Sequence, residues 1–199
     1  MKTKDKIIEV SIDLFSNDGY NGVSIRDITK VVGIQQSSLY KHFKGKEELL
    51  EPIFAIFLEA NSQSHLSKAE LNEILKERDL KEFLKSAIGS FFEDLENPRL
   101  EKIFRILMNE QFRLQQARNL IIDELITTPI EFYTHVFEIK LSDNNDNHAL
   151  LAREYYYPIY TMAYEYVLRK HDKQNVSSMK NQMLEHIEFF HDNVLIPKI

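Results

Sequence analysis

The chain has no cysteine among its 199 residues, and it has only five glycines and five prolines. Without cysteine it can form neither a disulfide framework nor a thiolate metal site. So few glycines and prolines disfavour a turn-rich β fold and favour long helices. No apolar run approaches the length of a membrane span, and the start of the chain is too charged for a secretory signal. We therefore expect a helical protein of the cytoplasm with no membrane partner.

Acidic residues outnumber basic ones and give a net charge of −6, but the two signs are distributed unevenly. Residues 1–46 carry eight Lys and Arg against five Asp and Glu, which leaves a balance of −9 for residues 47–199. A small basic segment on an acidic body is typical of a nucleic-acid-binding head attached to a larger domain. The positive excess is small, so electrostatic attraction to DNA is expected to be modest for each subunit.

The first 43 residues have the pattern of three short helices, predicted over about 4–18, 24–32 and 35–43. Ser24 and Asp27 form a capping-box pair at the start of the second helix, and Gly33 supplies a residue that tolerates a left-handed turn at its end. In a helix-turn-helix domain, the helix that follows such a turn is the one that enters the DNA major groove. The core is expected to consist of Ile8, Ile12, Phe15, Ile28, Val32, Leu39 and Phe43.

The outward face of the predicted third helix carries amide, hydroxyl, aromatic and basic side chains. Glutamine can pair with the edge of adenine and lysine with the acceptors of guanine, so the candidates for base reading are Gln35, Gln36, Ser37 and Lys41. A phenol, an imidazole and an amine suit an anionic oxygen, so the phosphate candidates are Tyr40, His42 and Lys46. The alternative is that these side chains are only solvated or stacked on the surface. All the predicted DNA contacts are Ser24, Arg26, Gln35, Gln36, Ser37, Ser38, Tyr40, Lys41, His42 and Lys46.

The run GYNGVSIRDITKVVGIQQSSLYKHFKGKEELL resembles the N-terminal domain of the tetracycline-repressor-like (TetR) family of bacterial transcription regulators. The matching features are a glycine-tyrosine pair after the first helix, Gly33 at the turn, and the aromatic and basic residues that lead to Lys46. One departure is that Gln35 and Gln36 stand where family members often carry serine and a basic residue. The operator sequence therefore cannot be carried over from a relative.

The resemblance implies an all-α fold with a helix-turn-helix DNA-binding head over 1–46 and a larger effector-binding and dimerisation bundle over 47–199. No strand pattern and no internal repeat is found. The family's dimers commonly form through the last two helices, which implies a homodimer on a near-palindromic double-stranded operator. Beyond the head, Gly45 is expected to cap a helix that begins near Lys46, and further helices are predicted over 68–77, 79–96, 98–126, 128–141, 147–171 and 176–194.

Aromatic residues are abundant in the predicted bundle, and they form either plain core or a ligand pocket. Family members usually hold a small molecule there, so the resemblance implies a repressor that an effector of unknown identity releases from DNA. Tyrosine suits such a pocket because it offers a flat apolar ring and one polar group. The pocket candidates are Phe104, Met108, Phe112, Tyr133, Tyr156 and Tyr160.

An enzyme would need a catalytic constellation, and none stands out. The chain has no glycine-rich phosphate loop, nucleophile elbow or His-Glu-x-x-His pattern, so we expect no catalytic residue, metal or cofactor. The remaining alternative is a helical adaptor or ligand-binding protein whose retained head no longer binds DNA. Tyr40, Lys41 and His42 disfavour it, because a head that had lost DNA would have no reason to keep them together.

Overall fold

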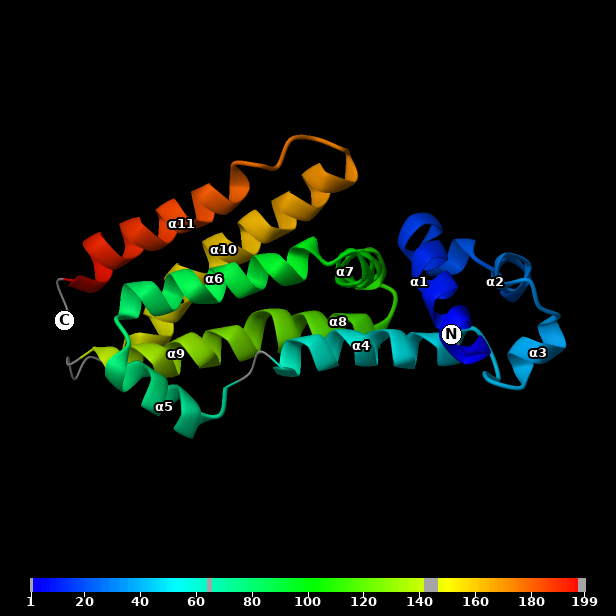
Figure 1. Ribbon diagram of the computed structural model, residues 1–199, viewed down its shortest axis with the longest axis horizontal. Helices are drawn as coiled ribbons and strands as arrows, with labels where there is room; N and C mark the ends of the chain where they lie inside the picture. The colour runs from blue at the N-terminus through cyan, green and yellow to red at the C-terminus, as the bar shows by residue number, and fades with distance from the viewer. Residues whose placement is uncertain (1, 64–65, 142–146, 197–199) are drawn as a thin grey trace. The chain divides into compact units, whose positions relative to one another are not determined.

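The computed structural model describes residues 2–63, 66–141 and 147–196, which form helices and turns with no strand (Figure 1). This confirms the predicted all-α fold. None of these helices is long and apolar enough to cross a membrane. In chain order the elements are α1 (Thr3–Gly22), α2 (Ile25–Val32), α3 (Gln36–Tyr40), the 3-10 turn η1 (Glu47–Leu49), α4 (Leu50–Gln63), α5 (Lys68–Glu77), α6 (Leu80–Glu96), α7 (Pro98–Glu110), α8 (Gln115–Ile122), the π-helical turn η2 (Asp123–Thr127), α9 (Thr128–Lys140), α10 (His148–His171), α11 (Met179–Phe190) and the π-helical turn η3 (His191–Leu195).

The helices group into two compact units. The first contains the described residues of Met1–Ser64 together with Asn97–Ile121, so α1 to α4 are joined by α7 and α8. The second contains those of His65–Glu96 and Ile122–Ile199, with α5, α6 and α9 to α11. Packing therefore attaches two helices from the middle of the chain to the N-terminal ones. The predicted functional division after residue 46 stays a prediction.

The core of the first three helices is close to the predicted one. Ile8, which was expected inside, is only half-buried, because the neighbouring Ile7 takes the inward position one turn before Ser11. Val31 lies on the outer side of α2 with 57% of its surface exposed. The side chains that fill this core are at most 4% exposed: Ile7, Ile12, Phe15, Ile28, Val32, Leu39 and Phe43.

The single helix predicted over 98–126 is wrong, because α7 and α8 are separated by a turn. Side chains satisfy the last carbonyls of α7 at this turn: the amide of Gln111 donates to the carbonyl of Met108 (2.8 Å), and the guanidinium of Arg118 donates to the carbonyl of Gln111 (2.9 Å). Such side-chain caps replace the hydrogen bonds that a helix end leaves open. Neither glycine nor proline marks this turn.

The predicted separation between a helix over 98–126 and another over 128–141, next to Pro129, is also wrong. The chain remains helical from α8 through the π-helical turn η2 into α9, and Pro129 lies in the first turn of α9, where a missing N–H is tolerated. Proline cannot donate to the carbonyl four residues earlier, which is that of Leu125. This carbonyl instead accepts a hydrogen bond from the hydroxyl of Tyr156 on α10 (2.8 Å).

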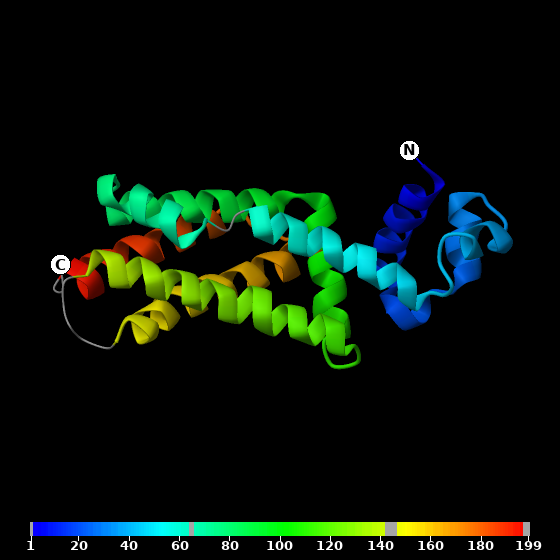
Figure 2. The same cartoon turned by 90° about the horizontal axis from the view of Figure 1, so that it is seen from below.

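The second unit is a bundle in which α10 packs along α9, while α11 packs against α6 and α10 (Figures 1 and 2). Buried residues of α10 such as Tyr155, Ile159 and Tyr166 face this bundle. Two ion pairs join α6 to the C-terminal elements of the unit, from Lys81 to Asp192 (2.9 Å) and from Lys85 to Glu188 (2.7 Å). The helices predicted over 147–171 and 176–194 thus correspond to α10 and to α11 with η3.

Candidate nucleic-acid interface

Helix α2 begins with the capping box that the sequence predicts. The hydroxyl of Ser24 accepts a hydrogen bond from the N–H of Asp27 (3.2 Å), and the Asp27 carboxylate accepts one from the N–H of Ser24 (2.9 Å). The hydrogen bonds from Ser24 hold the pKa of Asp27 below its usual value, so the carboxylate stays charged beside the positive end of the helix dipole. This pair fixes the residue at which α2 starts.

The turn between α2 and α3 depends on a glycine in the left-handed region. Gly33 has φ 79° and ψ 36°, and its N–H and that of Ile34 both donate to the carbonyl of Thr29 (2.9 and 3.0 Å). A residue with a Cβ is strained in this conformation. The predicted role of Gly33 is confirmed, and the turn it makes sets the direction in which α3 continues.

Helix α3 is shorter than the predicted 35–43: it spans five residues, with Gln35 preceding it. Beyond it the chain forms a tight turn in which the N–H groups of His42 and Phe43 donate to the carbonyl of Leu39 (2.9 and 3.0 Å). Leu39 is fully buried and attaches α3 to the core beneath it. The opposite side of α3 is free of core packing.

Eight of the ten predicted DNA contacts are exposed, and the other two are half-buried. Tyr40 is 50% exposed, which is a large fraction for an aromatic side chain. Two further exposed lysines were not among the predicted DNA contacts: Lys30 lies near the end of α2, and Lys44 follows α3. The Lys44 side chain is 93% exposed. The exposed predicted residues are Ser24, Arg26, Gln35, Gln36, Ser37, Tyr40, Lys41 and His42, and the half-buried ones are Ser38 and Lys46.

The amine of Lys46 is held inside the first unit. Its Nζ donates to the carbonyls of Tyr20 (2.7 Å) and Val23 (2.9 Å) and lies 4.1 Å from the centre of the Tyr20 ring. The helix expected from this point begins as the 3-10 turn η1, and the residue before it is Lys46, where Gly45 was expected. A lysine has three N–H donors, so these contacts occupy two of them.

The six pocket candidates fall into both units, and three of them form one cluster. In the second unit, the ring of Tyr156 lies 6.0 Å from that of Tyr133 and 6.2 Å from that of Tyr160. Burial raises the pKa of Tyr133 to about 12. In the first unit, Phe104 is buried and Met108 is half-buried, while Phe112 lies between α7 and α8 with 86% of its surface exposed. Phe112 therefore does not line an enclosed site within its unit.

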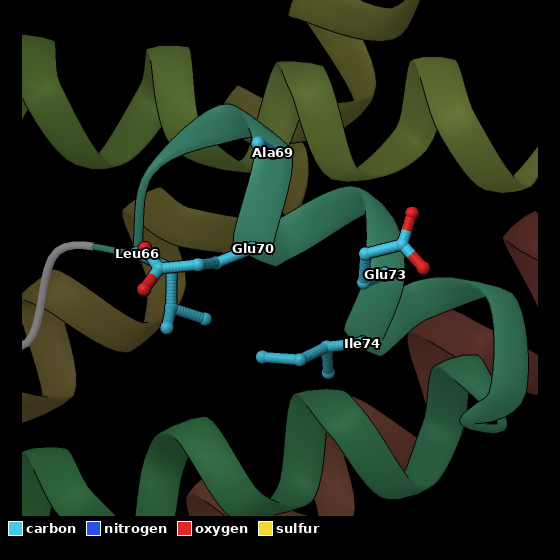
Figure 3. Close-up of a pocket in the computed structure, with 5 residues that line it drawn as sticks. All are labelled: Leu66, Ala69, Glu70, Glu73 and Ile74. Carbon is cyan, nitrogen blue, oxygen red and sulfur yellow. The ribbon is translucent and has the colours of Figure 1, made fainter.

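A hollow of the second unit lies elsewhere, on α5, and Figure 3 shows Ile74 pointing across it toward Leu66. Its two carboxylates already have partners, since Glu70 accepts hydrogen bonds from Ser67 and Glu73 pairs with a lysine of the same helix. None of the predicted pocket residues lines it. In the described parts of the chain, no group of three or more acidic or histidine side chains is placed to hold a metal ion.

The capped start of α2, the left-handed turn and the outward polar face of α3 are the features of a helix-turn-helix domain. Residues 7–53 match the family described as bacterial regulatory proteins, tetR family. This segment is therefore a TetR-family N-terminal domain. The matched residues include all of α2, α3 and η1 and the first turn of α4.

Two curated proteins are similar to part of this chain. The negative transcriptional regulator IcaR of the biofilm operon icaADBC in Staphylococcus epidermidis is 42% identical over 66 residues, 31% of this chain and 36% of the relative. The uncharacterised HTH-type transcriptional regulator YerO of Bacillus subtilis is 34% identical over 105 residues, 53% of this chain and 34% of the relative. The chain thus spans about a third of the length of each.

The fold resemblance extends over nearly the whole chain. A solved transcriptional regulator of Aquifex aeolicus superposes with a TM-score of 0.61 and 22% sequence identity, covering 94% of this chain and 99% of that one. At this identity the likeness concerns the fold alone. The predicted architecture, with a helix-turn-helix head and a further helical part, is therefore that of the family.

Proposed function

We propose that this TetR-family chain is a transcription regulator that reads DNA with α3. The observation that carries the proposal is the composition of the exposed side of α3, where Gln36, Ser37 and Tyr40 face outward above the buried Leu39. These side chains contribute little to the packing of their own unit. Amide and hydroxyl groups on an exposed helix after a helix-turn-helix turn are suited to base edges and phosphates.

Within this proposal, base reading belongs to the first turn of α3, and phosphate contacts surround it. Gln36 opens α3, and the first residues of a recognition helix are those that commonly reach base edges. Tyr40 and His42 follow at its other end, with Ser24 and Arg26 at the start of α2. The repressor role is supported by IcaR, a relative described as a negative regulator.

We further propose that the chain acts as a homodimer through α10 and α11. An apolar stripe runs along the outer side of α10, where Leu150, Tyr157, Tyr164 and Leu168 are 38–51% exposed. These positions recur at intervals of seven, seven and four residues, which places them on one helix face. Exposed apolar stripes of this length are typical of interaction surfaces. Two heads in a dimer would engage two half-sites of a near-palindromic operator.

We also propose that a small-molecule effector binds in the second unit. The cluster of Tyr133, Tyr156 and Tyr160 supports a small-molecule site in the second unit, because it joins apolar rings to phenol groups. Binding there would release the protein from DNA. The alternative is that these tyrosines are only core residues, and the free energy of unfolding of Tyr156→Phe, described in the Discussion, tests it.

The DNA-reading proposal is tested by fluorescence anisotropy with the DNA upstream of the chain's own coding sequence and a scrambled duplex of equal length. We expect the parent chain to prefer the upstream fragment, and Gln36→Ala to lose roughly tenfold of that preference while non-specific binding remains. Gln116→Ala, which removes an exposed glutamine of α8, outside the proposed reading helix and dimer helices, is the matched control and should bind as the parent does. Equal binding of both duplexes by the parent would favour the adaptor alternative instead.

A further inference from the structure

The main chain of Tyr20 is held on both of its polar groups by residues distant in the sequence. Its N–H donates to Oε1 of Glu110 at the end of α7 (2.9 Å), and its carbonyl accepts from Nζ of Lys46 (2.7 Å). Tyr20 directly follows Gly19, whose φ of 72° interrupts α1. The Tyr20 ring packs edge-on against Phe15 (5.2 Å between ring centres). We call Tyr20, Glu110 and Lys46 the Tyr20 clamp.

Glu110 is an unusual member of this clamp, because it is a carboxylate with only 1% of its surface exposed. Its second oxygen, Oε2, is buried without a hydrogen-bond partner among the described residues. Removing a carboxylate from water is costly, and an apolar side chain of similar volume is often as stabilising at such a position. Stability alone therefore gives no reason for a glutamate here, whereas the hydrogen bond to Tyr20 does.

The contact of Glu110 is the last of three polar contacts between α1 and α7, which lie side by side in Figure 2. The earlier two are the ion pairs Arg99–Glu9 and Lys102–Asp13, which are considerably more exposed to water. Exposed pairs of this kind contribute little to stability or geometry. The buried contact is thus the one that fixes the end of α7 against the end of α1.

We infer that Glu110 and Lys46 are positioning residues for DNA binding. By holding Tyr20 they fix the segment that leads from α1 into α2, and so they determine how α2 and α3 are presented. This inference rests on the proposed function, and it gives Lys46 an internal role in place of the phosphate contact predicted from the sequence. Neither residue touches DNA in this mechanism.

Two substitutions of Glu110 separate the hydrogen bond from the charge. Glu110→Gln keeps an oxygen acceptor for the Tyr20 N–H, and Glu110→Leu has a similar size but no acceptor; both remove the same negative charge. Lys46→Met removes the ammonium and keeps the length of the side chain. Lys102→Met is the control, because it deletes an α1–α7 ion pair without touching Tyr20.

We expect Glu110→Leu to bind operator DNA roughly tenfold more weakly, since it leaves a buried N–H without an acceptor. Glu110→Gln should stay within about threefold of the parent, as should Lys102→Met. The salt dependence decides the role of Lys46: loss of a phosphate contact lowers the slope by about 1, whereas loss of positioning in Lys46→Met weakens binding with the slope unchanged. A reduced slope in Lys46→Met would overturn the internal role.

Amide hydrogen exchange of Tyr20, followed by NMR, tests the clamp without DNA. The Tyr20 amide should exchange slowly in the parent and in Glu110→Gln and rapidly in Glu110→Leu, with the amides of Ile12 and Phe15, earlier in α1, as the folding control. Equal exchange in the parent and Glu110→Leu, or equally weak DNA binding by Glu110→Gln and Glu110→Leu, would overturn the inference. Failure of the parent to prefer any operator would instead refute the proposed function, while the exchange measurement would still decide the clamp.

Discussion

The hydrogen bond from Tyr156 to Leu125 makes a quantitative prediction about the second unit. Pro129 cannot donate to the Leu125 carbonyl, and the Tyr156 hydroxyl takes the place of the missing N–H at 2.8 Å. Tyr156→Phe removes this donor, while the ring is retained in its buried site, where it is 7% exposed. Leaving a partly buried carbonyl without a partner costs about 1–2 kcal/mol. For a chain of 199 residues this corresponds to a loss of about 2–4 °C in Tm for each kcal/mol.

Pro129→Ala provides the second half of the test, because alanine has an N–H that can reach the Leu125 carbonyl. In this background Tyr156→Phe should cost about 1 kcal/mol less than in the parent, since the backbone donor now replaces the hydroxyl. The free energies of unfolding would be measured by urea titration for the parent, both single variants and the double variant. These four values give the coupling free energy between Tyr156 and Pro129, which is the quantity that tests the prediction.

Tyr40→Phe is the matched control, because Tyr40 lies on α3, outside the second unit and the proposed dimer helices, and is 50% exposed. It should change the free energy of unfolding by less than about 0.5 kcal/mol. The reasoning would be refuted if Tyr156→Phe were equally harmless, or if its cost were the same with alanine at position 129. Such a result would mean that the Tyr156 hydroxyl does not stabilise the fold, which would favour a role for this hydroxyl in ligand binding.

Two further predictions concern the second unit. Burial raises the pKa of Tyr133 from 10.0 to about 12, so its contribution to the free energy of unfolding is complete below pH 10 and is lost as the pH rises toward 12. The free energy of unfolding should therefore fall steeply between pH 10 and 12. Tyr133→Phe should reduce the slope of that fall by up to about 1.4 kcal/mol per pH unit. Leu168→Glu places a charge on the exposed stripe of α10, so sedimentation should show monomers at concentrations where the parent is dimeric; an unchanged mass would exclude this stripe from the interface.

The parts of the structure that follow from local chemistry are predictable from the sequence. Ser24 and Asp27 stand three residues apart and therefore cap each other, and Gly33 adopts the left-handed conformation that the end of α2 requires. The face that α3 exposes follows from the buried Leu39, although the helix ends at Tyr40 and not at the predicted residue 43. Each of these signals lies within ten residues of its effect, so no tertiary information is needed.

The features that sequence reasoning missed are those decided by distant residues. Nothing near Glu110 indicates a buried carboxylate, because its partner Tyr20 lies 90 residues away. The amine of Lys46 donates to two carbonyls that lie 26 and 23 residues earlier, and nothing near Lys46 in the sequence indicates these contacts. Its predicted contact with a DNA phosphate stays a prediction. The continuity of the helix through Pro129 likewise depends on a hydroxyl from α10.

The length of α3 connects these local and distant effects. An isolated helix of five residues is not stable in water, because nucleation costs more than so few hydrogen bonds return. The reading helix therefore keeps its shape only through Leu39 beneath it and through the turns on either side. If α3 reads DNA as proposed, any contact that fixes those turns contributes to DNA affinity without touching DNA. On that proposal, we expect a buried carboxylate at the end of α7 to matter as much for DNA binding as an exposed glutamine on α3.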